Sequence, residues 1–333
     1  YTLSGQRRQV VEARGLKGLR VENPRGRVRV VPSPDGRLHV TALKFTRGDP
    51  SAEADALARK TLVESSTEDG RHVIRVRYPQ RVVRISFLRL LRGEVDVPSV
   101  KVRLLLEVPP GLTVDLESTS GDLETSGLDG PQTLETTSGD IAVQDAAAAV
   151  TIGTTSGDVS ATGLGRARVH SVSGDVTVAG ARGPPEVRTT SGEIEVEGAA
   201  DSVKVASVSG DIQVDGAPRG LEAGTTSGNV DVTGPVNGVA RARSTSGCVR
   251  LQLGPAVRRA DVSTVSGGIT VRLAAGLGCD LVLKSTSGHL EAAVPIQIRT
   301  MTRRELSGAV SGGGVPVSLH SVSGDITVSG GGR

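Results

Sequence analysis

Apolar and polar residues alternate through most of this chain, in a unit that repeats about every 18 residues. Each copy centres on a Ser-Gly step that is usually followed by Asp, as in VHSVSGDVTVAG at 169–180. The central serines of the eleven copies are Ser120, Ser138, Ser156, Ser173, Ser191, Ser209, Ser227, Ser246, Ser266, Ser287 and Ser323. A near-constant period of this length is typical of solenoids, in which each repeat packs on its neighbours.

Within each copy the apolar positions recur with a period of two, which predicts two short strands with apolar inner faces. Val169 and Val176 mark these faces on either side of Ser173, and equivalent positions in the other copies are also apolar. The same alternation places the Ser or Thr two residues before the central Ser, and the central Ser itself, on the inner face. These hydroxyls are expected to bond to one another or to the backbone. The glycine that follows allows a corner between the strands.

The repeat therefore predicts an all-β fold, a parallel β-solenoid (β-helix) of about 11–12 rungs over residues 116–333. At each corner the Asp is expected to accept hydrogen bonds from backbone N–H groups of the turn, because stacked carboxylates otherwise repel one another. The predicted structural turn ladder includes Ser138, Gly139, Asp140, Ser156, Gly157, Asp158, Ser173, Gly174, Asp175, Ser209, Gly210 and Asp211. Calcium between rungs is the alternative, but one carboxylate per rung is fewer than calcium loops supply. We predict no metal site and no cofactor.

Residues 1–115 lack a clean repeat and are predicted to form a small α+β cap on the N-terminal edge of the solenoid. Strands are expected at 19–21, 27–31, 38–46, 61–66, 72–78 and 100–108, a helix at 50–62, and an extended or partly disordered segment at 1–15. Charge supports this division. Residues 1–115 contain 22 Lys or Arg and 13 Asp or Glu, whereas residues 116–333 contain 17 and 23.

The basic character is concentrated in a segment that has no acidic residue and seven arginines, namely Arg71, Arg75, Arg77, Arg81, Arg84, Arg89 and Arg92. From residue 81 onward, a helix would place arginines on one side and apolar residues opposite, which is typical of a basic amphipathic helix on a membrane surface. A strand or hairpin with its arginines in solvent is the simpler alternative. An anionic lipid or envelope polymer is the predicted partner of this segment. Nucleic acid is not expected, because no aromatic stacking platform or binding motif accompanies the charge.

The residues that usually carry chemistry form no catalytic motif. The five histidines are scattered, and the serines recur with the rung, so none stands out as a nucleophile. Phe87 is the last aromatic residue, so the repeats offer no platform for sugar rings. Cys248 and Cys279 occupy different positions in their rungs, which argues against a disulfide framework. We predict a protein that is not an enzyme and has no small-molecule substrate.

Near the C-terminus the period breaks, because 36 residues separate Ser287 from Ser323. This gap equals two rungs, and residues 299–314 are expected to leave the wall as a loop or hairpin. The last copy, 319–330, returns to the consensus and is followed by no recognisable cap. An uncapped strand edge favours pairing with another chain. The sequence therefore predicts self-association through the C-terminal rung.

The units TTSGDI, SVSGDV and TSGEIEVEG, and the stretch VRLLLEVPPGLTVDLESTSGD before them, resemble the bacterial β-strand-repeat "putative adhesin" family, which includes LiaG-like proteins. The resemblance covers about residues 15–333 and transfers no catalytic residue. The arginine-rich segment is not part of the recognised pattern, so the resemblance assigns it no role. It implies a scaffold at the bacterial cell envelope or surface, often behind a membrane anchor. No signal peptide or membrane-spanning run is evident in the chain, which begins at Tyr1.

The predicted function is therefore a non-enzymatic envelope or surface solenoid that acts as an adhesion or scaffold module. The alternatives are a self-assembling structural protein that stacks through solenoid ends, and a calcium-binding repeat protein.

Overall fold

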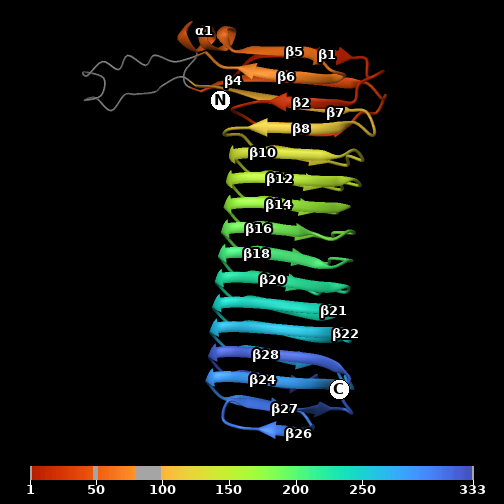
Figure 1. Cartoon of the computed structure of the whole chain (residues 1–333). Helices are drawn as coiled ribbons and strands as arrows, with labels where there is room; N and C mark the ends of the chain where they lie inside the picture. The colour runs from red at the N-terminus through yellow and green to blue at the C-terminus, as the bar shows by residue number, and fades with distance from the viewer. Residues whose placement is uncertain (1, 48–51, 80–98, 332–333) are drawn as a thin grey trace, which may run out of the picture. The chain divides into compact units, whose positions relative to one another are not determined.

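The computed structural model describes residues 2–47, 52–79 and 99–331 and divides into two compact units, residues 1–148 (unit 1) and 149–333 (unit 2). The described residues form 29 strands and one helix, α1 (Ala52–Lys60), which confirms the all-β prediction and the expected helix (Figure 1). None of these residues belongs to a helix that is long and apolar enough to cross a membrane. The predicted boundary at residue 115 stays a prediction.

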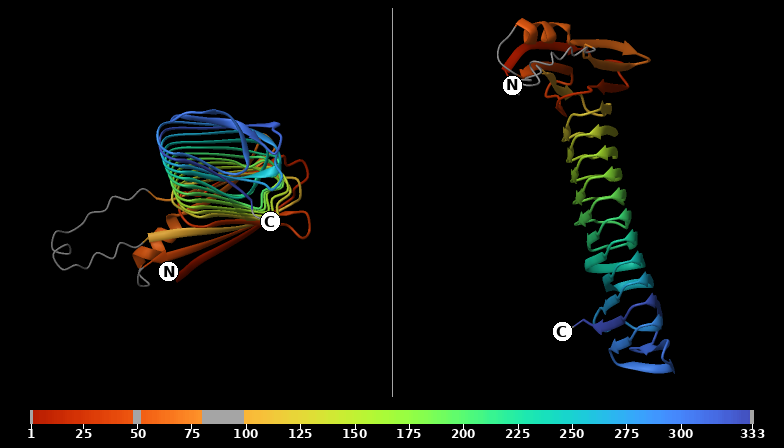
Figure 2. Two further views of the ribbon diagram at one scale, coloured as in Figure 1. Left: turned by 90° about the horizontal axis from the view of Figure 1, so that it is seen from below. Right: turned by 90° about the vertical axis from the view of Figure 1, so that its left-hand side faces the viewer.

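Unit 2 is built from two-strand coils that stack in parallel and in register (Figure 2). The first strands stack in the order β12 (Ala149–Ser156), β14 (Arg166–Ser173), β16 (Glu186–Ser191), β18 (Val203–Ser209), β20 (Gly220–Ser227), and the second halves of β21 (Val230–Ser246) and β22 (Val249–Ser266). The second strands stack in the order β13 (Val159–Thr162), β15 (Val176–Ala179), β17 (Ile194–Glu197), β19 (Ile212–Asp215), and the first halves of β21 and β22. Each central serine pairs with the next, so the sequence repeat sets the register.

The inner faces carry the predicted apolar columns, with Val169 and Val176 buried in the coil of Ser173. Ser171, two residues before the central serine, is fully buried as predicted. The central serine itself is exposed, and so is the residue before it, which makes the prediction of an inward Ser173 wrong. The alternation of side chains holds only while the strand stays extended, and the chain begins to turn at this position.

Backbone carbonyls accept hydrogen bonds from several of the buried hydroxyls. In each of these pairs the acceptor is the corner glycine of the preceding coil: Thr225 Oγ1 donates to Gly210 O (3.2 Å), Ser244 Oγ to Gly228 O (2.9 Å) and Thr264 Oγ1 to Gly247 O (3.1 Å). The expected bonding to the backbone is therefore present in these coils. The hydroxyls of Ser118, Thr136, Thr154, Ser171 and Ser207 are also buried, but they bond to no other described residue.

The corner glycines are required by the close approach of one coil to the next. Gly174 has a φ of 129° and Gly192 a φ of 134°, which residues with a side chain rarely adopt. A Cβ on Gly192 would also overlap the carbonyl oxygen of Gly174 far inside van der Waals contact. The glycine of the Ser-Gly step is therefore a steric requirement of coils that stack in register.

The last repeat of the sequence does not lie at the end of unit 2. β28 (Val315–Ser323) pairs in parallel with β22 on one side and with β24 (Cys279–Ser287) on the other. β29 (Ile326–Gly330) lies in the same way between β23 (Ile269–Leu273) and β25 (Leu290–Ala293). The repeat of Ser323 is thus inserted between the repeats of Ser266 and Ser287. The prediction of an open edge at 319–330 is wrong, because this repeat has a neighbour on both sides.

Because of this insertion, β24 is the last of the parallel first strands. An antiparallel hairpin covers its other edge. β27 (Glu305–Val310) pairs with β24, and β26 (Ile296–Met301) pairs with β27, as Figure 1 shows in blue. Residues 299–314 were expected to leave the wall as a loop or hairpin. The hairpin is present, but it does not leave the wall, because β27 extends the wall as an antiparallel strand beside β24. The outermost strand on this side of unit 2 is therefore β26.

Unit 1 contains the coils of Ser120 and Ser138 and, beside them, coils that the repeat pattern did not reveal. β8 (Thr113–Ser118) and β9 (Leu123–Ser126) form the coil of Ser120, and β10 (Gln132–Ser138) and β11 (Ile141–Gln144) stack on them. On the other side of β8 and β9 lie β2 (Gly18–Glu22) and β3 (Val28–Pro32), in parallel. β6 (Arg71–Arg77) and β7 (Ser99–Val108) follow, also in parallel. The coil of β2 and β3 is therefore inserted between two others.

Antiparallel strands complete unit 1. β5 (Leu62–Glu68) pairs with β6, β4 (Leu38–Arg47) pairs with β7, and β1 (Thr2–Val11) pairs with β4. The strands expected between residues 19 and 108 are confirmed. Residues 1–15 were expected to be extended or partly disordered, and residues 2–11 of this segment form a strand on β4 with one irregularity between Leu3 and Gly5.

Register shows that β2 and β3 form a degenerate copy of the repeat. Val21 pairs with Leu116, and Arg25 forms a bridge to Ser120, so ENPRGRV takes the place of ESTSGDL. Asn23 occupies the position of the buried hydroxyl. Its Nδ2 donates to Gly26 O (3.2 Å) and Val102 O (2.9 Å). A buried amide thus replaces the hydroxyl column at this coil.

Candidate functional site

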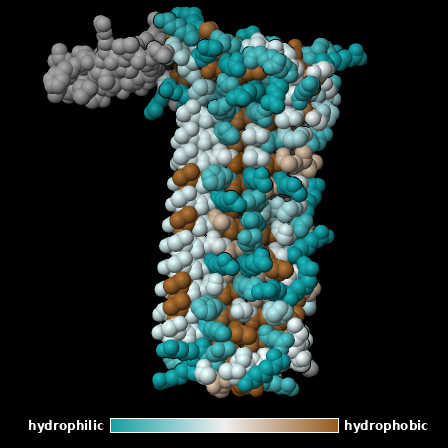
Figure 3. Space-filling model, viewed as in Figure 1, coloured by the Kyte–Doolittle hydropathy of each residue, from teal (hydrophilic) through white to brown (hydrophobic). Residues whose placement is uncertain are grey.

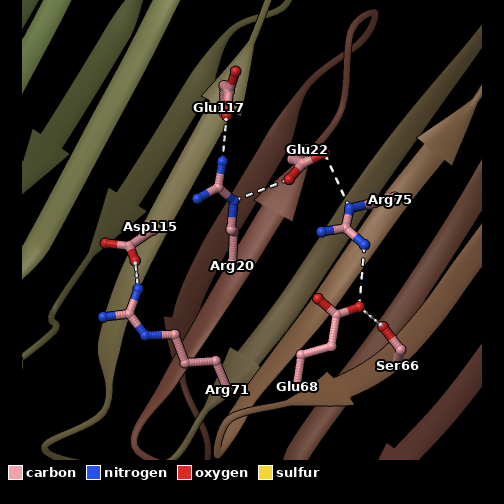
Figure 4. Close-up of polar contacts among 8 residues, drawn as sticks. All are labelled: Arg20, Glu22, Ser66, Glu68, Arg71, Arg75, Asp115 and Glu117. Atoms are coloured by element: carbon pink, nitrogen blue, oxygen red, sulfur yellow. Dashed lines mark hydrogen bonds and ion pairs between the residues drawn. The ribbon is translucent and has the colours of Figure 1, made fainter.

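Three of the arginines predicted to bind an anionic surface lie on β6, and all three are already paired with carboxylates. Figure 4 shows the pairs of Arg71 and Arg75. The pairs are Arg71 with Asp115 (2.9 Å), Arg75 with Glu68 (3.1 Å) and Glu22 (3.2 Å), and Arg77 with Glu64 (2.6 Å). The other four predicted residues, Arg81, Arg84, Arg89 and Arg92, lie outside the described residues. The anionic-surface site at 71–92 stays a prediction, and the described part of it offers little uncompensated charge.

The ion pairs on β6 also keep their members charged. The hydrogen bond to Glu68, with the charge of Glu22, raises the pKa of Arg75 above its usual value. Hydrogen bonds from Ser66 and then Arg75 lower the pKa of Glu68. These side chains are partly exposed to solvent, so each pair contributes little to stability. Their main effect is to fix the charge pattern across strands β2, β5, β6 and β8.

The acidic corner column forms a hydrogen-bonded ladder between coils. The side chain in one coil accepts the backbone N–H of the equivalent residue in the neighbouring coil. The bonds are Asp175 N to Asp158 Oδ1 (3.0 Å), Glu193 N to Asp175 Oδ1 (2.9 Å), Asn229 N to Asp211 Oδ1 (2.7 Å), Cys248 N to Asn229 Oδ1 (2.9 Å) and His289 N to Asp325 Oδ1 (2.8 Å). The bond from His289 lowers the pKa of Asp325. Within the described ranges no three His, Cys, Asp or Glu side chains are grouped as a metal would require.

This ladder predicts a difference between two substitutions at one position. Asp211→Ala removes the acceptor for the N–H of Asn229 and should lower the free energy of unfolding by about 1–2 kcal/mol. Asp211→Asn keeps an acceptor oxygen, as Asn229 already does for Cys248, and should stay close to wild type. Urea unfolding of the two variants measures this. A calcium site would instead show itself as a melting temperature that falls on addition of a chelator, which we do not expect.

A basic groove lies on the wall formed by the first strands of unit 2, with a volume of about 930 Å³. Residues from β16, β18, β20, β21, β22 and β28 line it. Its floor includes Ala206 and Gly224, which have a small side chain and none, respectively. Figure 3 shows this wall, where hydrophilic side chains stand beside hydrophobic atoms of the floor. Its basic residues are Arg188, Lys204, Arg241, Arg243 and Arg259, with His320 beside them.

The cationic side chains of this groove differ in whether a carboxylate lies close enough to neutralise their charge. Three of them have acidic partners: Arg188 with Glu186 (2.8 Å), Lys204 with Glu222 (3.4 Å) and Arg259 with Asp261 (2.7 Å). Arg241 and Arg243 are exposed and have no ion-pair partner in the described part of the chain. These two guanidinium groups are therefore available to a ligand.

Charge is segregated between the two walls of unit 2. We count residues 239–246 and 259–266 with the first strands, and residues 230–234 and 249–253 with the second. The first strands then carry eight Lys or Arg against four Asp or Glu, and the second strands carry two against five. The acidic corner residues lie beside the second strands and add to this difference. An anion approaching unit 2 is therefore attracted to the first-strand wall, where the groove lies.

Sequence reasoning did not find this groove. The outward residues three before each central serine differ from copy to copy, and which of them become neighbours depends on which coils are adjacent. His320 lies beside Ser263 only because β28 is inserted next to β22. A usable signal was the pair of small residues, Ala206 and Gly224, between Arg188 and Arg243 in the same column.

The Toastrack DUF4097 family matches residues 34–233 and 168–329, and the chain belongs to this family. This membership agrees with the adhesin-type repeat family that the sequence resembles. No curated protein matches the chain.

Three solved structures resemble the chain weakly. They are a "putative cell adhesion protein" from Clostridium sporogenes (9% identity, TM-score 0.24, 99% of this chain and 100% of that chain), a "putative adhesin" from Parabacteroides distasonis (11%, 0.35, 98% and 97%) and a "putative adhesin" from Bacteroides fragilis (10%, 0.26, 97% and 97%). With TM-scores below 0.5, these likenesses add nothing to the family assignment.

Proposed function

We propose that the chain is a non-enzymatic repeat module of the bacterial cell envelope or surface, which binds through the first-strand wall of unit 2 in adhesion or as a scaffold. The observation that carries this proposal is the basic groove on a wall that concentrates the positive charge of the unit. Parallel coils repeat outward side chains about every 4.8 Å, which suits contact with an extended partner.

The parallel solenoid of about 11–12 rungs belongs to this proposal. Parallel, in-register pairing of the coils within each unit supports it, as does membership of a repeat family. The absence of an enzymatic role also remains a proposal. It is supported by the corner serines, which recur in the eleven copies of the repeat, so that none stands out as a nucleophile.

Co-sedimentation of the purified chain with isolated bacterial envelopes tests the proposed function. We expect binding at low salt that weakens as added salt screens the charges. Arg241→Gln/Arg243→Gln should bind less, because it removes the two unpaired cations of the groove. Arg258→Gln/Arg272→Gln removes the same charge from exposed arginines outside the groove and should bind like wild type. A chain that stays in the supernatant at low salt would contradict the proposal.

Self-association is a second candidate, and one observation favours a different surface from the one predicted. β26 is paired only with β27 among the described strands, and it exposes Ile298 (52%) and Met301 (72%). An edge strand with exposed apolar residues is a template for pairing with another copy. This candidate requires that the mass of the full chain in solution rises with concentration.

A further inference from the structure

We infer that the groove on the first-strand wall of unit 2 binds a linear phosphate polymer that runs along the stack of coils. This inference rests on the proposed function, in which that wall is the binding surface, and adds the chemical class of the ligand.

The groove has the length of a polymer site. Its lining comes from six coils that are consecutive in space, from β16 to β28. Five steps of about 4.8 Å give a length of about 24 Å. A single small anion would occupy only a fraction of this length. An extended chain with repeated charges can contact cations at both ends of the groove at once.

One register row shows how such a chain would lie. Successive coils place Arg188, Ala206, Gly224, Arg243, Ser263 and His320 side by side. The two small residues in the middle thus have an arginine on each side. Beyond Arg243 the row continues with the hydroxyl of Ser263 and the imidazole of His320. A narrow chain can rest on the two small residues while Arg243, which has no ion-pair partner among the described residues, reaches its charged groups.

Gly224 is a glycine that the fold itself does not need. A Cβ at this position would meet no atom within 4 Å, and its φ lies outside the positive range. It differs in this respect from Gly228 in the same coil, whose Cβ would overlap the carbonyl of Gly210. Glycine inside a strand costs about 0.5–1 kcal/mol and often marks the close approach of a ligand. The open floor at Gly224 is therefore an observation independent of the charge.

The donor set favours phosphate over other anions. Four of the five basic residues are arginines, whose planar groups donate paired hydrogen bonds to phosphate oxygens. Arg241 and Arg243 project two residues apart on one strand, about 7 Å from each other along it. A phosphate within a chain presents oxygens in several directions and can bridge two such groups. Residues 149–333 contain no Phe, Tyr or Trp, so sugar rings and bases would find no stacking surface.

Fluorescence anisotropy with end-labelled inorganic polyphosphate and the full chain tests this inference. Arg241→Gln/Arg243→Gln should weaken binding at least about tenfold, which corresponds to about 1.4 kcal/mol. Gly224→Phe should weaken it to a similar degree, because the new ring fills the floor where a Cβ meets no atom. The matched control Arg258→Gln/Arg272→Gln should stay within about twofold of wild type. Thermal melts of the variants verify that each one folds.

Several outcomes would overturn the inference. These are groove variants that bind polyphosphate like wild type, orthophosphate that competes as well as the polymer, and a preference for polyglutamate, hyaluronate or anionic vesicles over polyphosphate. Envelope sedimentation in parallel separates the two proposals. If envelope binding depends on Arg241 and Arg243 but polyphosphate does not bind, the ligand class is wrong and the proposed function stands. If polyphosphate binds at the groove but envelopes do not, the proposed function is wrong.

Discussion

Gly210→Ala is expected to lower the free energy of unfolding by about 3 kcal/mol or more, although it adds a single methyl group. The new Cβ would overlap the carbonyl oxygen of Gly192 and press on Ser207 Oγ. The corner cannot move away, because the coil of Ser209 is paired in register with coils on both of its sides. Its backbone must therefore distort, or the contacts between coils must open.

The matched control is Gly224→Ala, the same substitution one coil further along. Its Cβ meets no atom, and alanine is better than glycine in a strand, so stability should be unchanged or rise by about 0.5 kcal/mol. Urea unfolding followed by circular dichroism measures both variants. Equal midpoints for the two would show that the corner tolerates a side chain, and the steric account of the Ser-Gly repeat would fail.

The same steric account explains why so much of the coil could be predicted from the sequence. Each position in a coil packs against the equivalent position of the adjacent coils, so the apolar columns and the corner glycine recur with little variation. Ser173 was misplaced because alternation extends only to the corner, and a period of two says nothing about where a strand starts to turn. The coil of β2 and β3 was missed because Asn23 and Arg25 stand where the other copies have hydroxyls.

The order of the coils could not be predicted, because repeats with the same inner columns are interchangeable as neighbours. Leu319 of the last repeat packs between Val262 and Leu283, and any of the aliphatic residues in that column would offer a similar surface. The candidate groove depends on this order, since His320 enters it through the insertion of β28. A site built from several coils is therefore less predictable than the coils themselves.

Each unit, taken by itself, holds a coil from one end of the chain between two other coils. In unit 1, β2 and β3 lie between β6 and β8 and between β7 and β9. In unit 2, β28 and β29 lie between β22 and β24 and between β23 and β25. The outermost repeat of a stack frays most easily, because it has one neighbour instead of two. In unit 2, insertion gives the C-terminal segment two neighbours and leaves the outermost position to β26 and β27, which are held on both sides in sequence. In unit 1 the N-terminal strand β1 still lies at the edge, on β4.

This arrangement predicts a large effect from deletion of residues 315–333. The deletion removes Val317, Leu319, Ile326 and Val328, each at most 1% exposed, whose burial contributes roughly 6–12 kcal/mol before the entropy of ordering is subtracted. It also leaves the strands on both sides of the inserted coil without a partner on the side that faced it. We expect a lower unfolding midpoint and a larger mass by light scattering than the full chain shows at the same concentration, because open parallel edges pair with other copies.

Two point variants separate the inserted core from its surface. Leu319→Ala should lower the free energy of unfolding by about 2–5 kcal/mol. Val322→Ala in the same strand, where the valine is 40% exposed, should change it by less than about 1 kcal/mol. A truncated chain that keeps the full-length midpoint and mass would mean that the inserted coil contributes nothing to closing unit 2. The only remaining explanation for the order of coils would then be the pairing of β24 with β27. That pairing covers the edge of the first-strand wall but not the edge of the second strands.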